Sequence, residues 1–270
     1  TTVQTKLRES VSVFDFMTAA QVAYVKGGAY VAGISTAIQN AVNSASSIHF
    51  PAGTYNLLYG IELPSNCTLT GDGKFSTIIR AQDLCLEKNT GVPVDGLYPG
   101  GLLKASNKTN IQIKDLCIDG NFAGQIPSVY CNNVQFHRTS YVTIDNCRSI
   151  NSMQESLLFN GSWHCSVTNC ITSNNQYSGI NTAIAPDFTY VDLYTPDYSS
   201  QSEYFTCTNN VSVSDGGAIA SAYSINNRYA VVSNNTIYNG GLTGITLGHD
   251  SDGVRPPHDA SYCSVTGNTI

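Results

Sequence analysis

The six residues VTIDNC, Val142 to Cys147, place two apolar side chains one polar residue apart and then turn through Asp and Asn. The same order of residue types returns in IQIKDL from Ile111, CSVTNC from Cys165, FTCTNN from Phe205, AVVSNN from Ala230 and CSVTGN from Cys263. Aligned on the second apolar residue of each copy, neighbouring copies lie 31, 23, 40, 25 and 33 residues apart. This spacing predicts a coil of fixed circumference with insertions in some turns.

A second short apolar segment precedes most copies of the repeat. These segments are VQF (Val134 to Phe136), LLF (Leu157 to Phe159), GIN (Gly179 to Asn181), AIA (Ala218 to Ala220) and GIT (Gly244 to Thr246). Several copies also lead into a third, such as VSVS after Asn210. Three short strands per coil, with inward residues alternating, predict an all-β fold, a right-handed single-stranded parallel β-helix. Ile113, Ile144, Val167, Cys207, Val232 and Val265 should then form one column inside it.

The end of each repeat predicts a second column at a bend of the coil. Its members would be Cys147, Cys170, Asn210, Asn235 and Asn268. Stacked Asn side chains can hydrogen-bond to one another along the column and to the backbone of the turns. The alternative is that Asn stands there only because it favours turns.

The N-terminal part predicts two helices, over Thr18 to Val25 and Gly33 to Ser44. The second has apolar residues at helical spacing and should cover the open end of the solenoid, because an exposed coil end would leave strand edges unpaired. HFPAGTYNL, His49 to Leu57, then reads as strand, tight turn and strand, which would be the first coil. We therefore expect a connector with capping helices over 1–47 and the β-helix over 48–270.

Composition excludes several classes of protein. The net charge is −6 and charged residues are only 12% of the chain, which disfavours a nucleic-acid partner. No apolar run is long enough for a membrane span, and no signal-peptide pattern stands at the N-terminus. The nine cysteines form no C-x-x-C pair, so we expect buried free thiols in a protein folded in a reducing cytosol, and no metal or other cofactor.

Several N-terminal stretches together resemble the start of a known family. VSVFDF from Val11, TAIQNAV from Thr36, IHFPAGTYNL from Ile48, LPSNCTLTGDG from Leu63 and STIIRA from Ser76 are similar to the pectate-lyase-like β-helix domain of bacteriophage tailspikes. The resemblance is specific over 7–81 and rests on the coil pattern alone after that.

The resemblance implies a homotrimer that binds and usually cleaves bacterial surface polysaccharide, capsule or O-antigen. It further implies a protein of the virion, on the phage tail, folded in the host cytoplasm and attached to the tail or baseplate by a further N-terminal domain. The chain starts without Met and stops at VTGNTI inside a coil. We therefore expect the natural chain to continue at both ends.

Hydrolysis of a glycosidic bond uses two carboxyl groups, about 5–5.5 Å apart for retention and about 6.5–9.5 Å apart for inversion. Glu155 and Asp215 stand just before the LLF and AIA segments, which would put them two coils apart, close to the inverting distance. Tyr177, on the coil between them, could be a platform for a sugar ring. The alternative is that both acids are solvated turn residues.

Two insertions add further candidates. LGHDSDGVRPPHD, 247–259, contains His249, Asp250 and Arg255, which could bind sugar hydroxyls or act as acid and base. The longest gap between repeats holds Tyr190 and Tyr194, whose rings suit sugars, and could form a groove wall or a subunit contact. Trp163, one coil below, could reach the same face. We predict Glu155, Asp215 and Asp250 as catalytic and the other named residues as substrate-binding.

Three functions remain open at this stage. The first is an endo-glycosidase that depolymerises the polysaccharide. The second is a lyase for a uronate-containing glycan, which needs a base and a cation beside the carboxylate, and Arg138, Arg228 and Arg255 could supply the cation. The third is an adhesin that grips glycan without cleaving it.

Overall fold

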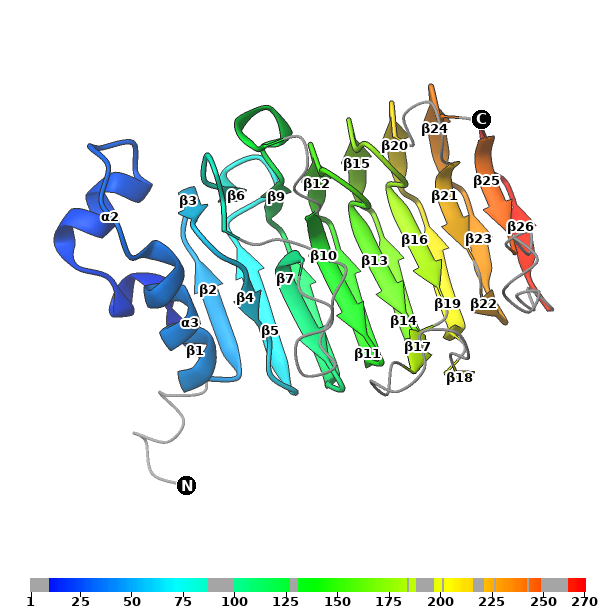
Figure 1. The fold of residues 1–270 in the computed structure, drawn as a ribbon, viewed down its shortest axis with the longest axis horizontal. Helices are drawn as coiled ribbons and strands as arrows, with labels where there is room; N and C mark the ends of the chain where they lie inside the picture. Colours follow the sequence, from blue (N-terminus) through cyan, green and yellow to red (C-terminus); the bar gives the residue numbers. More distant parts are fainter. Residues whose placement is uncertain are drawn as a thin grey trace.

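The computed structural model describes residues 10–86, 100–126, 131–183, 185–187, 197–200, 202–215, 221–225, 227–241, 243–248 and 262–270. In these parts the chain winds as a solenoid with two helices and a short 3-10 turn at its N-terminal end (Figure 1). No helix among the described residues has the length and apolarity that a bilayer crossing needs.

Sheet A is the longest of three parallel sheets. Its strands, in spatial order, are β1 (Ser10–Ser12), β2 (Ser47–Phe50), β5 (Cys67–Gly71), β8 (Thr109–Lys114), β11 (Ser140–Asp145), β14 (Trp163–Thr168), β19 (Ser202–Thr208), β23 (Val231–Ser233) and β26 (Ser264–Thr266), with β22 (Asn227–Arg228) also on β19.

Sheets B and C run beside it. Sheet B consists of β3 (Gly53–Leu57), β6 (Thr77–Ala81), β9 (Cys117–Asp119), β12 (Arg148–Ile150), β15 (Ile171–Ser173), β20 (Val211–Val213) and β24 (Thr236–Tyr238). Sheet C consists of β4 (Ile61–Glu62), β7 (Gly101–Ser106), β10 (Asn132–His137), β13 (Leu157–Asn160), β16 (Ile180–Ala183), β21 (Ser221–Ile225) and β25 (Thr243–Leu247). The chain visits A, B and C in turn, which makes each circuit one coil.

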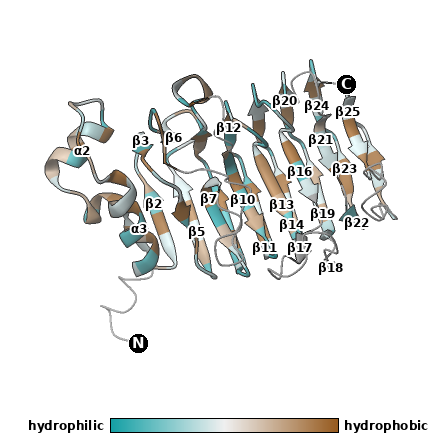
Figure 2. Cartoon of the chain, in the orientation of Figure 1, coloured by the Kyte–Doolittle hydropathy of each residue, from teal (hydrophilic) through white to brown (hydrophobic). Residues whose placement is uncertain are grey.

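The register of sheet A confirms the predicted inner column. Ile113 pairs with Ile144, Ile144 with Val167, Val167 with Cys207, Cys207 with Val232 and Val232 with Val265. All but Val265 are fully buried. Hydrophobic residues recur from strand to strand along the solenoid (Figure 2), so the repeat buries one continuous core.

The predicted Asn column is confirmed at the bend from sheet A to sheet B. The backbone N–H of Cys170 donates to Asn210 Oδ1, that of Asn210 to Asn235 Oδ1, and that of Asn235 to Asn268 Oδ1, each at 2.9 Å. Each Asn side chain in turn donates to a carbonyl group of the preceding coil, as Asn210 does to Val167 O at 2.9 Å. Asn is therefore placed there for its two-sided amide and not only because it favours turns.

The N-terminal cap is confirmed in outline. α2 (Ala19–Val25) begins at the N-cap Thr18, and α3 (Ile34–Ser44) begins at Gly33, whose φ of 88° suits glycine. α3 buries Ile34, Ala37, Ile38 and Ala41 against the first coil and against η1 (Val13–Phe16). Beside it, β1 pairs with β2, so the connector adds a strand to sheet A.

One predicted strand cannot be compared with the structure, because the segment AIA, Ala218 to Ala220, lies outside the described residues. Directly after it, the structure has β21 at Ser221–Ile225, where Tyr223 pairs with Ile180. Tyr223 and Ile225 are both fully buried, so this strand continues the core of sheet C.

All nine cysteines are free thiols, and eight of them are buried. Burial raises the pKa of Cys67 and of Cys165 to about 12, so these groups stay protonated and unreactive. The prediction of buried free thiols is confirmed. In sheet A and at its bends the small, apolar side chain of Cys serves as core filling.

Candidate functional site

The bend from sheet B to sheet C carries a column of polar residues. Asn151, Asn174 and Ser214 follow the in-register residues Ile150, Ser173 and Val213, and all three have left-handed backbone with φ of 52° to 57°. Asn tolerates this conformation better than most residues with a side chain. The bend therefore repeats from coil to coil and stacks polar side chains along the axis.

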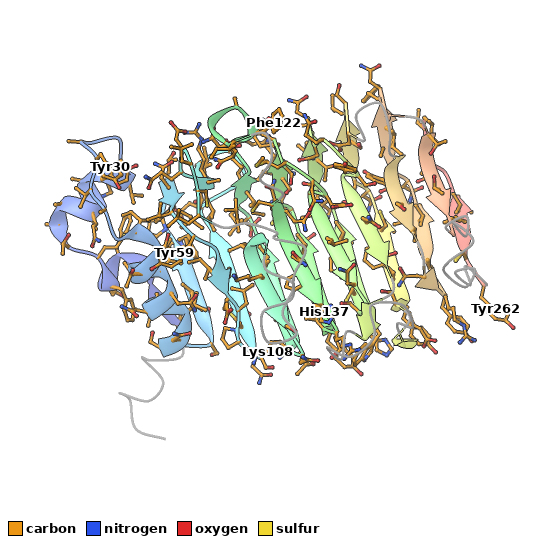
Figure 3. The ribbon with its side chains drawn as sticks, in the orientation of Figure 1. Tyr30, Tyr59, Lys108, Phe122, His137 and Tyr262 are labelled. Carbon is orange, nitrogen blue, oxygen red and sulfur yellow. The ribbon has the colours of Figure 1, made fainter. Side chains whose placement is uncertain are left out.

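A groove of about 540 Å³ runs along the sheet B side of this bend. The short 3-10 helix η2 (Phe122–Gly124) forms one wall, and residues 174–176 contribute the other. Phe122 stands at the upper edge of the molecule in Figure 3. The groove is also lined by Arg80, Asp119, Asn121 and Asn151.

Hydrogen bonds hold the charged residues of the groove in place. Arg80 donates to Asn121 Oδ1 at 2.6 Å and lies 3.5 Å from Asp119 Oδ2. Asp119 Oδ1 accepts from the Asn151 amide and from the Asn121 backbone, both at 2.9 Å. The Arg80–Asp119 pair is part-exposed and adds little stability. Its effect is to orient the amides and to leave the groove with no net charge.

Asp215 follows Ser214, which lines the groove, and is buried inside the bend. Its carboxylate accepts from Thr172 Oγ1 at 2.5 Å, from Ser212 Oγ at 2.6 Å and from Asn175 Nδ2 at 2.7 Å, and its exposed fraction is 0%. Burial raises the pKa of Asp215, and these hydrogen bonds oppose the increase. The side chain of Asn175 in turn accepts from the backbone N–H of Ser152, so the three residues link neighbouring coils.

This position differs from the one expected. Asp215 is equivalent to Asn175 and Ser152 and not to Glu155, because Val213 pairs with Ser173 and Ser173 pairs with Ile150 in sheet B. The alternative of a solvated turn acid is wrong for Asp215. The described contacts give it a structural role, and its assignment as a catalytic residue stays a prediction.

Glu155 stands on the other side of the same bend, at the start of β13. Its Oε1 accepts from Asn181 Nδ2 on β16 at 3.2 Å. Burial raises the pKa of Glu155, against hydrogen bonds from its own backbone and from Asn181 that lower it. A carboxyl group that keeps its proton at higher pH than usual is suited to act as a general acid.

Further amide side chains, which were not selected from the sequence, lie on β10, the strand next to β13. Asn132 Nδ2 donates to Gln135 Oε1 at 3.2 Å, and the two residues are 0% and 2% exposed. Within the described structure, Asn132 Oδ1, Gln135 Nε2 and Asn181 Oδ1 are buried without a hydrogen-bond partner. Such atoms are costly unless water or a ligand pairs with them. In the sequence, the polar residues within the apolar strand NNVQFH could have indicated this site.

The other residues predicted to form the site lie in different parts of the chain. Tyr177 is part-buried, and its backbone N–H donates to Gln154 O at 3.3 Å, which puts it beside Glu155 on the next coil. Trp163 is 40% exposed at the start of β14, beyond the far end of β13, so the structure does not bring it to Glu155. Tyr190, Tyr194, His249, Asp250 and Arg255 lie outside the described residues.

The insertion after β16 begins as an antiparallel hairpin of β17 (Ala185–Asp187) and β18 (Asp197–Ser200). It leaves the solenoid at the bend from sheet C to sheet A, at the lower edge in Figure 1. This is the same bend that carries Trp163, as expected from the sequence. It is the opposite end of the sheet C strands from Glu155.

That bend also carries a column of stacked rings, which was not predicted from the sequence. Tyr141, His164, Tyr204, Tyr229 and Tyr262 stack with centroid distances of 4.7–5.1 Å and interplanar angles of 6–8°. Each lies three residues before the aligned apolar position of its repeat, which could have revealed it. The ring faces cover one another, so only ring edges along the column face solvent, and the interior rings offer no face to a sugar.

No group of His, Cys, Asp or Glu with the arrangement of a metal site occurs among the residues that the structure describes. One bend of the parallel β-helix thus carries a carboxyl of raised pKa with buried amides on its sheet C side and a polar groove on its sheet B side. These features define a β-helix protein of the carbohydrate-active kind.

Comparison with known proteins agrees with this class. The family described as rhamnogalacturonase A/epimerase, pectate lyase-like, matches residues 30–255, which is most of the chain, and the protein belongs to this family. The sequence-based resemblance to pectate-lyase-like right-handed β-helices is confirmed. No curated protein matches the sequence.

Solved structures share the fold. A proposed glycosyl hydrolase from Parabacteroides merdae matches with a TM-score of 0.59 and 13% identity, over 93% of this chain and 99% of that one. The catalytic domain of a GH87 α-1,3-glucanase in complex with nigerose matches with a TM-score of 0.59 and 15% identity, over 91% of this chain but only 45% of that one. At these identities the likeness establishes the fold alone.

Proposed function

We propose that this protein binds an extended bacterial surface polysaccharide on sheet C and cleaves internal glycosidic bonds, with Glu155 as the general acid. The observation that carries the proposal is the Glu155 carboxyl, whose pKa is raised by burial and which lies beside buried amides without partners. The family supports a polysaccharide as the substrate class.

Each residue would have one task. Glu155 would protonate the glycosidic oxygen as the bond breaks. Asn181 would hold the carboxyl toward the sugar, and Asn132 and Gln135 would bind its hydroxyl groups, since a hydroxyl both donates and accepts. Tyr177, one coil on, would contact the neighbouring sugar unit.

Hydrolysis also needs a second carboxyl group. Glu62, on β4, belongs to the same sheet, but two strands (β7 and β10) lie between it and β13, where Glu155 stands, a distance of roughly 14 Å, which is too far. Asp215 is enclosed by its hydrogen bonds. Asp250 therefore remains the proposed partner of Glu155, with His249, Arg255, Tyr190 and Tyr194 as proposed contacts to the glycan.

The test is an assay of polysaccharide cleavage. Purified protein is incubated with capsule or O-antigen preparations, and new reducing ends are measured together with absorbance near 235 nm for unsaturated uronates. New reducing ends alone are expected. Glu155→Gln should abolish them, whereas Glu62→Gln, an exposed acid of the same sheet, should not. Cleavage that survives Glu155→Gln would overturn the assignment of Glu155.

Binding without cleavage is the second candidate function. The observation that favours it is that, in the described part of sheet C and its bends, only Glu155 combines a raised pKa with part-exposure. A protein that binds polysaccharide but releases no ends would be an adhesin. Absorbance near 235 nm would instead indicate a lyase. Of the cations proposed for that reaction, Arg228 lies 3.3 Å from Glu203 at the opposite bend.

The biological setting is proposed on the sequence resemblance. The protein would act as a homotrimeric tailspike on a phage virion, attached to the tail through another domain. Sedimentation equilibrium of the purified chain tests the trimer, and a monomer at all concentrations would speak against it.

A further inference from the structure

The groove on the sheet B side of the bend is separate from the Glu155 site. Arg80 and Asp119 belong to β6 and β9, and Phe122 belongs to η2, all of which precede the strands of sheet C at that bend. Glu155 and its amide neighbours belong to β13, β16 and β10 of sheet C. We propose that this groove is a second, non-catalytic binding site for a short neutral oligosaccharide.

The shape of the groove suits a segment of polymer. It passes the bends that follow β9, β12, β15 and β20, which are consecutive coils of the solenoid. Three steps between neighbouring strands give a length of about 14 Å. A chain lying along the solenoid axis would meet similar polar groups at each coil, which a repeating polymer can match.

The chemistry of the lining suits hydroxyl groups. Asn174, Gln176 and Ser214 present groups that both donate and accept, as a sugar hydroxyl does. Asn174 and Gln176 are exposed, and in the described structure their side chains make no hydrogen bond. They can therefore bind a ligand without breaking a contact of the fold.

The charge of the lining disfavours acidic sugars. Among the described residues that line the groove, Arg80 is the one cation and Asp119 the one anion, and they lie 3.5 Å apart with Asn121 hydrogen-bonded to Arg80. A uronate would have to compete with Asp119 for Arg80, in a protein whose net charge is −6. A neutral sugar would neither compete with Asp119 for Arg80 nor be repelled by the net negative charge.

Phe122 supplies the apolar part of the site. It is 38% exposed on the groove wall, so its ring is available to the apolar face of a sugar. The aromatic column at the opposite bend differs in this respect, because the faces of its interior rings are already covered by neighbouring rings.

The test uses the Glu155→Gln protein, so that cleavage does not interfere. An array of neutral oligosaccharides of graded length is probed first, beside uronate-containing oligosaccharides of the same lengths. The best-binding neutral oligosaccharide is then titrated by calorimetry. Phe122→Ala and Asn174→Gly should each weaken its binding by about five- to tenfold. Glycine keeps the left-handed backbone at 174 while removing the amide.

Tyr30→Ala is the matched control, because Tyr30 is an exposed aromatic residue of the N-terminal cap, far from Phe122 in Figure 3, and its loss should leave binding unchanged. Equal affinity in all variants, a preference for uronates, or no binding to any neutral oligosaccharide would each overturn the proposal. These outcomes do not depend on catalysis, since a protein that cleaves nothing can still bind in this groove.

Discussion

Asp215 shows how one enclosed carboxylate can act on stability and on its pH dependence. Asp215→Ala would leave the donors of Thr172, Ser212 and Asn175 without an acceptor, so the free energy of unfolding should fall by at least about 2 kcal/mol. Urea denaturation measures this loss. If Asp215 is structural, Asp215→Asn should also retain the cleavage activity that Glu155→Gln loses.

The raised pKa of Asp215 makes a second, separate prediction. The folded state keeps the proton at pH values where the unfolded chain has lost it. The contribution of this group to stability is therefore full below the ordinary Asp pKa of 3.8 and declines as the pH rises through the folded pKa. Asp215→Asn should remove this decline. An unchanged pH dependence of the difference between wild type and Asp215→Asn would contradict the burial of the charge.

The Asn181 amide affects the pKa of the Glu155 carboxyl. Its amide donates to the ionised carboxyl and so lowers the pKa of Glu155, against the effect of burial. Asn181→Ala should raise that pKa and move the alkaline limb of the kcat/KM profile to higher pH, because a general acid must be protonated. Asn160→Ala, on the neighbouring strand β13, is the control and should leave the limb in place. A shift to lower pH would exclude Glu155 as the acid.

The candidate residues differ in how far the sequence could predict them. Glu155 could be selected as a candidate because an acid before an apolar strand is visible in the sequence. Asn132 and Gln135 were not, because a polar residue in a strand gains a role only when the register shows which face it is on. The partners of Asp215 depend on the pairing of β20 with β15, whereas the sequence comparison had placed Asp215 by the apolar segment that follows it.

At the scale of elements, the aromatic column is a ladder whose members have different numbers of neighbours. Tyr204 stacks on His164 and on Tyr229, whereas Tyr262 stacks in the described structure only on Tyr229. With about 0.5–1.5 kcal/mol for each stacked pair, Tyr204→Ala should cost about twice as much stability as Tyr262→Ala. Thermal unfolding of both variants and of the Tyr204/Tyr229 double mutant measures the coupling. Equal costs would mean that stacking does not hold this bend.

The elements also show why some strands were easier to predict than others. Every repeat in sheet A was aligned correctly, because its two apolar residues are followed by a fixed Asn or Asp turn. The strands of sheet C have no such marker, and the equivalence of Glu155 and Asp215 that was inferred from them is wrong. The two predicted helices began within one residue of the observed ones, since Thr18 and Gly33 act as their N-caps.

At the scale of the whole molecule, each coil contacts mainly the coils before and after it. The stability of such a solenoid is close to a sum over neighbouring coils, and an end can open without unfolding the rest. α3 closes the N-terminal end with Ile38, which is fully buried in the core cluster. The candidate site, at β10 to β16, lies several coils away from this cap.

The distance between cap and site makes the last prediction. Ile38→Asp buries a charge under the cap and should destabilise it strongly, because Ile38 is fully buried in the hydrophobic core cluster. Hydrogen exchange should then speed up in β2, β3 and β4, while β13 and β16 keep their protection and Glu155 its activity. Asn40→Asp places the same charge on the exposed face of α3 and should change neither. Uniformly faster exchange along the whole chain would show that the solenoid unfolds as one unit and that the cap holds every coil.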